Sequence, residues 1–315
     1  MSEKSEEKEK FQSKAIWWTV GIVLGLSIAA VVISVSKRQQ KTIVDNTVSD
    51  LEALQDRVIF DDIKIKVNPD LFSQEQIHQE IAENDIISYL KHNVKKGDTV
   101  IYVSFDIGVQ QLLIAKLIEQ SGRIYVFNPI ERYNAAICLS ADANGFDNRI
   151  LSESLAISDK PYDGHLVYKV GMPLSEGSLK DINYAGQSGE NILPVRVSTL
   201  DLACANLQNV DLLRISTAQE AINVIRGAKK LIERSPKIKI VIDHDKQAGN
   251  SEALWTLQDE GFTIYTIDEQ GETSMANLND IRSKHLLLIP KHTPKKDNTP
   301  ETEDNKTSNG NEIFS

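Results

Sequence analysis

The stretch "TVIYVSFDIGVQQ" (99–111) carries the clearest signal for the fold. Its apolar run predicts a buried strand, and after Gly108 the apolar residues take the spacing of a helix. A strand that passes through a glycine turn into a helix places the first amide groups of the helix at the strand end, where an anion or nucleoside can bind. The GxGxxG and GxxxxGK[ST] patterns are absent. The stretch therefore predicts one β-α unit and leaves open whether its loop holds a ligand.

The alternation of strand and helix continues from about residue 61 to residue 290. Strands are expected at 63–67, 99–104, 123–127, 149–153, 210–215, 237–242, 263–267 and 285–289. Helices are expected at 73–94, 109–120, 131–143, 219–233 and 251–260. This order predicts a mostly parallel sheet with helices on both faces. Residues 164–201 break the alternation with glycines and short β-like pieces, which indicates an inserted hairpin or lid.

A charge-free segment near the N-terminus predicts a membrane anchor. After a polar segment (1–14), residues 15–36 read "AIWWTVGIVLGLSIAAVVISVS". As a helix this segment is about 33 Å long, enough for a hydrocarbon core of about 30 Å. A cleaved signal peptide would have an apolar region about half as long and a small-residue cleavage site. We therefore expect one transmembrane helix that binds the lipid bilayer. Basic residues flank it on both sides, so its orientation stays open.

Two further segments lie outside the alternating region. In residues 37–60, Val44, Val48, Leu51 and Val58 have the spacing of an amphipathic juxtamembrane helix. Such a helix could self-associate as a stalk or pack on the domain. Residues 291–315 are polar with few apolar residues and predict a disordered tail.

The composition excludes several classes of protein. A net charge of −10 without a concentrated basic face argues against nucleic-acid binding. Cys138 and Cys204 have no CxxC spacing, so we expect buried free thiols and no disulfide. The histidines are dispersed and form no HExxH or HxH pair, so no metal site is expected.

Polar residues follow the predicted parallel strands where ligands bind in doubly wound sheets, at the carboxyl ends. These candidates are Ser104, Asp106, Gly108, Asn128, Ser158, Ser216, Asp243 and His244. The triplet Asp243–Asp245 could supply a general base or a metal ligand, since an imidazole stands between carboxylates. Adjacent side chains of an extended chain point in opposite directions, which favours a structural or solvent-facing role.

The order of the motifs resembles the FkbM-type methyltransferase family. The likeness rests on "KKGD" (95–98), "DIG" (106–108), "GRIYVFNP" (122–129), "NGFDN" (144–148), "AISD" (156–159), "VSTLDLA" (197–203), "VDLLRISTAQEAINVIRGA" (210–228) and "IVIDHD" (240–245). It covers roughly residues 60–290. The resemblance implies a Rossmann-like, doubly wound, mostly parallel seven-stranded sheet of the S-adenosylmethionine-dependent methyltransferase type. In this chain that α/β domain (61–290) would follow a single transmembrane helix.

The resemblance also implies roles for individual residues. Ser104, Asp106, Gly108, Asn128, Ser158 and Ser216 would contact S-adenosylmethionine, and Asp201, Asp243 and His244 would handle substrate or protons. The chain departs from the family at several of these positions. Tyr102 and Asn128 stand where the family has acids, Ser104 where it has a glycine, and Ser216–Gln219 replace "DVEG". A carboxylate accepts stronger hydrogen bonds than an amide, and each loss costs about 1–3 kcal/mol of binding.

Two functions therefore remain open from the sequence. The first is a membrane-anchored methyltransferase that transfers a methyl group to an oxygen of a sugar, glycan or similar polar metabolite. It would need its domain on the cytoplasmic side, where the cofactor is found. The second is a catalytically inactive pseudo-methyltransferase that serves as a membrane-tethered binding or assembly module.

Overall fold

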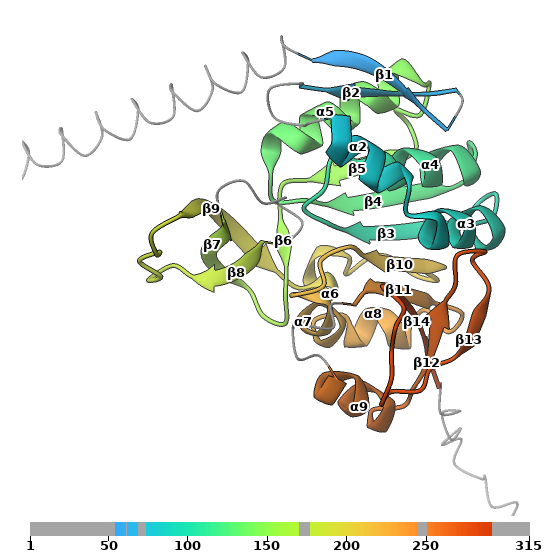
Figure 1. Cartoon of the computed structure of the whole chain (residues 1–315), viewed down its shortest axis with the longest axis vertical. Coiled ribbons are helices and arrows are strands. Elements are labelled where there is room, and N and C mark those ends of the chain that lie inside the picture. The colour runs from blue at the N-terminus through green and yellow to red at the C-terminus, as the bar shows by residue number, and fades with distance from the viewer. Residues whose placement is uncertain (1–53, 61, 69–73, 170–176, 245–250, 292–315) are drawn as a thin grey trace, which may run out of the picture.

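The computed structural model describes residues 54–60, 62–68, 74–169, 177–244 and 251–291 (Figure 1). Its main sheet has eight strands. In spatial order they are β13 (Thr273–Met275), β12 (Phe262–Ile267), β14 (His285–Pro290), β11 (Lys239–Asp243), β10 (Leu212–Ile215), β3 (Thr99–Val103), β4 (Arg123–Phe127) and β5 (Ile150–Glu153). Strands β11, β10, β3, β4 and β5 pair in parallel, whereas β14 runs antiparallel between β11 and β12. The sheet is mostly parallel and Rossmann-like.

Helices cover both faces of this sheet, because its strands bury side chains on both sides. Along β3, Val100 and Tyr102 belong to the core on one face, and Ile101 and Val103 belong to the core on the other. The first face is covered by α2 (Gln74–Ile81), α3 (Asn84–Asn93), α4 (Val109–Leu117) and α5 (Glu131–Ala143). The second is covered by α6 (Leu200–Ala203), α7 (Ala221–Arg226), α8 (Lys229–Glu233) and α9 (Ser251–Asp259).

Several elements differ from the sequence prediction. The sheet has an eighth strand, β13, whose three residues are all exposed and give no apolar signal. The helix expected at 73–94 is broken at Ala82 and Glu83 into α2 and α3. The helix expected at 219–233 is broken at Gly227 and Ala228 into α7 and α8. Sequence spacing does not reveal such breaks, because tertiary contacts decide them.

Residues 55–59 correct the prediction of a helix over 37–60. They form strand β1 (Gln55–Ile59), which pairs antiparallel with β2 (Ile63–Val67). Ile59 and the inward residues of β2 are buried, while Val58 is 64 % exposed. The side chain of Val58 therefore belongs to no helical apolar face. The backbone hydrogen bonds that β2 offers decide the conformation of this segment. The rest of 37–60, up to residue 53, lies outside the described residues.

The predicted insertion is a small β-sheet of its own. Its four strands lie in the order β6 (Ala156–Ile157), β9 (Glu190–Ser198), β7 (Tyr162–Lys169) and β8 (Ser178–Asp181). Figure 1 shows β7, β8 and β9 extending from the side of the molecule. Within it the N–H of Ser158 donates to the carbonyl of Ser198 at 2.8 Å, and the N–H of Leu179 on β8 donates to the carboxylate of Glu220 in the body at 3.1 Å. We call residues 156–198 the β-insert.

The cysteine prediction holds for one of the two residues. Cys204 is buried and free. Cys138 is also free but exposed, since it lies on the outward side of α5 while Ile137 and Ala141 pack into the core. The expectation of a buried Cys138 was wrong.

The predicted N-terminal segment (1–14), transmembrane helix (15–36), most of the stalk and the tail after Lys291 lie outside the described residues. Within the part of the chain that the structure does describe, none of the helices has the length and apolarity to span a bilayer.

Candidate functional site

Asp106 is the centre of the polar side chains at the carboxyl ends of the strands. Its Oδ1 accepts hydrogen bonds from Gln111 Nε2 at 2.6 Å and from the N–H of Gly108 at 3.2 Å. Its Oδ2 accepts from Ser216 Oγ at 2.8 Å and from Tyr102 Oη at 3.2 Å. Three residues predicted from the sequence, Asp106, Gly108 and Ser216, are thus brought together. Burial raises the pKa of Asp106, although these donors oppose the rise.

Two other predicted cofactor contacts, Ser104 and Asn128, are fully buried. Ser104 Oγ accepts a hydrogen bond from Gln111 Nε2 at 3.1 Å. The side-chain amide of Asn128 donates to the carbonyl of Asp106 at 2.9 Å, and its oxygen accepts from the N–H of Ile130 at 3.0 Å. Asn128 therefore ties the loop after β3 to the loop after β4. Its polar atoms are engaged within the chain.

Arg214 lies at the middle of the sheet and is fully buried on β10. Its guanidinium donates to Gln110 Oε1 at 3.1 Å and to the carbonyl of Ile215 at 2.7 Å. Its Nη2 is 2.6 Å from Asp243 Oδ1, and its Cζ lies 5.9 Å from the ring centroid of Tyr102. Burial acts to lower the pKa of Arg214, but the charge of Asp243 outweighs it and the pKa is raised. Arg214 is therefore a permanent buried cation.

The charged groups continue from Arg214 to β14 and the α2–α3 break. His285 is fully buried, with Nε2 at 3.3 Å from Asp243 Oδ1 and Nδ1 at 2.6 Å from Asp85 Oδ2. Burial acts to raise the pKa of Asp85, but the hydrogen bond and charge of His285 outweigh it, and the pKa is lowered. Glu83 accepts from Gln110 Nε2 at 3.0 Å and pairs with Lys284.

These side chains form one connected network, which we call the rim cluster. It consists of Glu83, Asp85, Tyr102, Asp106, Gln110, Gln111, Arg214, Ser216, Asp243 and His285. The members come from β3, β10, β11, β14, α4 and the residues around the α2–α3 break. Asp243, predicted as a catalytic residue, is held here between a guanidinium and an imidazole.

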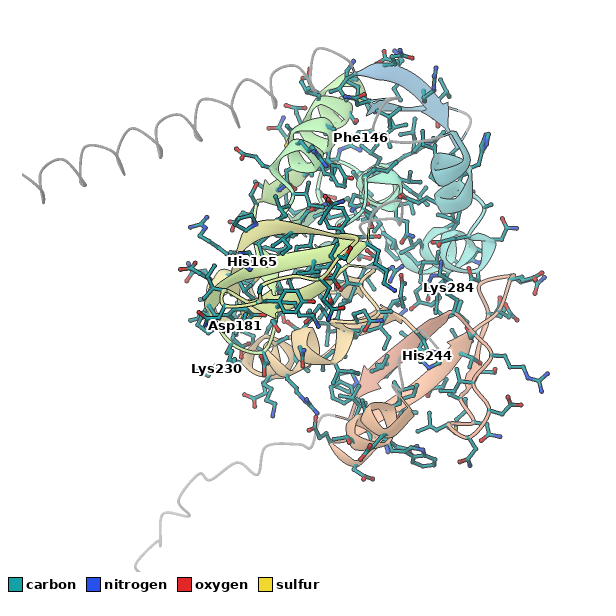
Figure 2. All side chains as sticks on the ribbon, turned by 60° about the vertical axis from the view of Figure 1, so that its left-hand side comes forward. Phe146, His165, Asp181, Lys230, His244 and Lys284 are labelled. Carbon is teal, nitrogen blue, oxygen red and sulfur yellow. The ribbon has the colours of Figure 1, made fainter. Side chains whose placement is uncertain are left out.

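Three further predicted site residues have other contacts. The carboxylate of Asp201 accepts from the N–H groups of Lys230 at 3.2 Å and Leu231 at 2.8 Å, so it caps α8. Ser158 is buried where β6 meets β9. His244 is buried, and its backbone N–H donates to the backbone carbonyl of Lys284 at 2.7 Å. Figure 2 labels both residues. The carboxylate of Asp201 and the backbone N–H of Ser158 thus bind parts of the chain other than Asp106.

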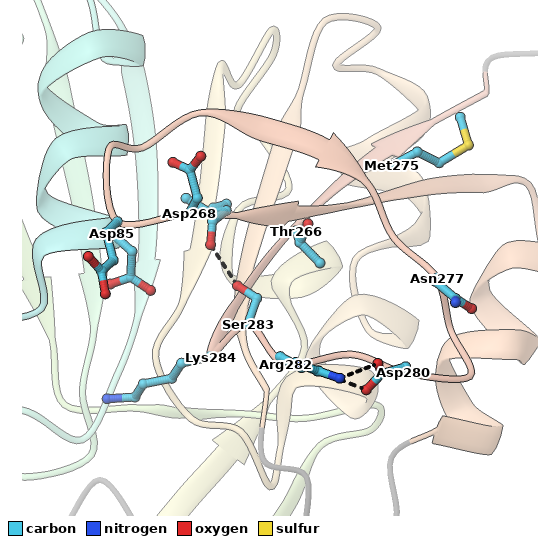
Figure 3. Close-up of a pocket in the computed structure, with 11 residues that line it drawn as sticks. Asp85, Thr266, Asp268, Met275, Asn277, Asp280, Arg282, Ser283 and Lys284 are labelled. Atoms are coloured by element: carbon cyan, nitrogen blue, oxygen red, sulfur yellow. Dashed lines mark hydrogen bonds and ion pairs between the residues drawn. The ribbon is translucent and has the colours of Figure 1, made fainter.

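A groove of about 660 Å³ lies beside the rim cluster, at β12, β13 and the segment that precedes β14 (Figure 3). Asp85 and Lys284 form its boundary with the cluster. The charged side chains that line it are partly paired, since Arg282 lies 3.0 Å from Asp280 and Lys284 pairs with Glu83. Among the residues that the structure describes, no three His, Cys, Asp or Glu side chains are grouped as a metal site.

The carboxyl of Glu80, on α2, makes the stability of this region depend on pH. Burial raises its pKa well above the usual value, and the charges of Asp106 and Glu83 raise it further. A carboxyl whose pKa is raised by folding stabilises the fold when protonated, and that stability is lost as the pH rises through the folded-state pKa. The pKa of Asp106 is raised as well, so it acts in the same direction.

We therefore expect Glu80→Gln to raise the free energy of unfolding at pH 8 by about 1 kcal/mol and to have less effect at pH 5. Chemical denaturation at both pH values measures this difference. Glu119→Gln, at an exposed carboxylate paired with Lys96, is the matched control and should leave the pH dependence unchanged. A loss of stability at pH 8 in Glu80→Gln would contradict the assignment.

Comparison with known proteins gives likenesses only among solved structures. No protein-family model and no curated protein matches the chain. A S-adenosylmethionine-dependent O-methyltransferase from Thermotoga maritima is 11% identical, with 76% of this chain and 79% of that chain covered and a TM-score of 0.38. A methyltransferase from Geobacter sulfurreducens is 14% identical, with 72% and 90% covered and a TM-score of 0.39. Fibrillarin from Aeropyrum pernix, with natively bound S-adenosylmethionine, is 14% identical, with 65% and 76% covered and a TM-score of 0.37.

Two of these proteins are thus connected with S-adenosylmethionine: the Thermotoga maritima enzyme depends on it, and the Aeropyrum pernix fibrillarin holds it.

The residues of the rim fit that cofactor poorly. Gly108 still opens α4 with a backbone φ of +108°, and the first turn of the helix faces the rim. However, Ser104 and Asn128 are 0 % exposed and their side chains bind other parts of the chain. Tyr102 occupies a position where the family has an acid. Its hydroxyl lies within hydrogen-bond distance of Gln110 and Asp106. At positions 102 and 128, where the family has acids, the polar side-chain atoms are thus bound within the chain.

Proposed function

We propose that this chain is an FkbM-like, methyltransferase-fold protein that works as a membrane-tethered binding or assembly module rather than as an enzyme. The observation that supports it most directly is that the described polar side chains at the carboxyl ends of β3, β4 and β10 are hydrogen-bonded within the chain. The polar side chains of Ser104, Asn128 and the rim cluster form hydrogen bonds with one another or with nearby backbone groups. The chain thus retains the fold, but most of the side chains at the positions of cofactor contacts are buried parts of its interior.

The energetics of opening this region support the proposal. A nucleoside at the loop after β3 would have to displace Tyr102 or Gln111 and break the hydrogen bonds of Asn128. A buried polar group left without a partner costs about 1–3 kcal/mol. Two or three such losses weaken binding by several powers of ten.

The proposed tether consists of the apolar segment at 15–36, and the segment up to residue 53 would link it to β1. The linker is the proposed region of self-association. The side of the membrane on which the domain lies does not follow from a binding role alone.

The second candidate is active transfer of a methyl group from S-adenosylmethionine to an oxygen of a sugar or similar polar metabolite. It is favoured by one specific feature, the convergence of the Asp106 carboxylate, the Gly108 N–H and Ser216 at the start of α4. The start of a helix attracts negatively charged groups. This candidate requires the domain to lie on the cytoplasmic side, and the groove beside Lys284 would receive the substrate.

A thermal-shift titration separates the two candidates. The full-length chain in detergent is titrated with S-adenosylmethionine and with its demethylated product into the millimolar range. A ligand raises the melting temperature only when its concentration approaches the Kd, so we expect a shift below about 0.5 °C. A saturable rise of the melting temperature with either compound would contradict the proposed binding module and favour the active methyltransferase.

The double variant Tyr102→Asp with Asn128→Glu provides the positive counterpart. It restores both acids that the family resemblance expects, and we expect it to respond to S-adenosylmethionine where the natural chain does not. Circular dichroism establishes whether the variant is folded. A folded variant without any response would show that the loop after β3 does not derive from a cofactor site.

A further inference from the structure

A cavity at the other end of the sheet is separate from the rim cluster. It lies at the amino ends of β3, β10 and β11, beneath the end of α3, and its volume is about 170 Å³. Since a water occupies about 30 Å³ of liquid, the cavity holds several waters or one small metabolite. Five of its lining residues carry the argument: Tyr89, Asp98, Asp211, Lys237 and Lys239.

The missing hydrogen-bond partner of the Tyr89 hydroxyl indicates that the cavity holds a ligand. Tyr89 is 1 % exposed, and among the described residues its hydroxyl has no hydrogen-bond partner. Buried polar groups in folded proteins nearly always have a partner, either in the protein, in water or in a ligand. Tyr89 lines the cavity, so a ligand held there can supply that partner.

The cavity is lined by charges of both signs. Asp98 Oδ2 accepts from the N–H of Lys95 at 2.8 Å, and Asp211 Oδ2 accepts from the N–H of Thr99 at 2.8 Å. Each carboxylate therefore keeps its other oxygen for a further donor. Burial raises the pKa of Asp98, and the nearby charge of Asp211 raises it too, so a cation placed between the two carboxylates would be favoured.

Two ammonium groups complete the lining. Lys239 Nζ donates to Asn93 Oδ1 at 3.0 Å and keeps further donors, because an ammonium carries three N–H bonds. Lys237 is exposed at the cavity mouth, and its ammonium group has no ion pair or hydrogen bond with a described residue. These ammonium groups suit a carboxylate.

We propose that this cavity binds a small zwitterion, a free α-amino acid. Its ammonium group binds Asp98 and Asp211, its carboxylate binds Lys237 and Lys239, and the Tyr89 hydroxyl supplies a further hydrogen bond. The cavity volume limits the ligand to amino acids with small side chains. The site does not depend on the rim cluster or on the proposed function.

The test uses the full-length chain in detergent and three matched probes. L-Alanine carries both charges, propionate lacks the ammonium group, and ethylamine lacks the carboxylate. We expect L-alanine to raise the melting temperature saturably. Propionate and ethylamine are expected to bind at least about tenfold more weakly, because each loses a charge-assisted contact.

Tyr89→Phe locates the binding in this cavity. It keeps the ring and removes only the hydroxyl, so the ligand-free melting temperature is expected to stay the same or rise. Its affinity for L-alanine is expected to fall at least about tenfold. Tyr184→Phe, which removes a hydroxyl bonded to Glu190 in the β-insert, is the matched control and should keep the natural affinity.

Three outcomes would overturn the proposal. If L-alanine has no effect on the natural chain, the cavity holds water only. If propionate binds as tightly as L-alanine, the site is one for simple anions. If Tyr89→Phe binds L-alanine normally, the binding occurs elsewhere on the molecule.

Discussion

Replacement of Arg214 by methionine is expected to lower the free energy of unfolding by about 3–5 kcal/mol. Methionine preserves most of the side-chain volume, so the loss does not come from a large cavity. It comes from Asp243, whose carboxylate would lose the guanidinium 2.6 Å away and remain largely buried. Gln110 would lose a donor at the same time. Chemical denaturation followed by circular dichroism measures the change.

Three further variants identify the cause of this loss: Lys116→Met, Asp243→Asn, and Arg214→Met combined with Asp243→Asn. Lys116→Met removes a cation from an exposed pair with Asp62 and should cost less than about 1 kcal/mol. Arg214→Met combined with Asp243→Asn removes both members of the buried pair. If the uncompensated charge is the cause, the double variant loses less than the sum of the two single variants. A fully additive loss would mean that the packing of Arg214 matters more than its charge.

Gly227→Ala is expected to destabilise the protein by about 1–3 kcal/mol through a collision between the body and the β-insert. A Cβ at Gly227 would lie 2.1 Å from the carbonyl oxygen of Ser158. The obstacle is backbone that is itself hydrogen-bonded to β9, so it cannot move as a flexible side chain would. Thermal denaturation gives the size of the effect.

Hydrogen exchange tests where the effect of Gly227→Ala is located. The amide of Ser158 should exchange faster in the variant, because the pairing between β6 and β9 begins beside the collision. Gly189→Ala is the matched control. A Cβ at Gly189 meets open space, so only its backbone φ of +84° opposes the change, at about 1 kcal/mol. Equal effects at the two glycines would show that close packing at Gly227 is unimportant.

Much of the main sheet could be predicted because its strands are buried on both faces and appear as short apolar runs. The structure confirms the predicted bounds of β2, β4 and α5. Two strands that form by pairing with the edge of a neighbouring strand were missed. β1 forms because β2 offers it hydrogen bonds, and β13 forms because β12 has a free edge. The intrinsic pattern of these two segments is too weak to indicate a strand.

The candidate site was predicted only in part, and for a related reason. The rule that ligands bind at the carboxyl ends of parallel strands singled out Ser104, Asp106, Gly108, Asn128 and Ser216, and hydrogen bonds link these residues directly or through Gln111. It says nothing of side chains that reach the same place from elsewhere, such as Gln110 from α4 or His285 from β14. One signal was available in the sequence. Arg214 stands inside the run "VDLLRI" (210–215), and a cation in a buried strand requires an anionic partner.

The antiparallel direction of β14 has a practical consequence for labelling the protein. The strand starts beside Asp243, where His285 pairs with it, and reaches Pro290 opposite Phe262, the first residue of β12. The chain therefore leaves the folded body on the side away from Asp106. A fluorescent reporter or an affinity handle joined directly after Lys291 would start from that side, so capture experiments can keep the face around Asp106 accessible to a ligand or partner.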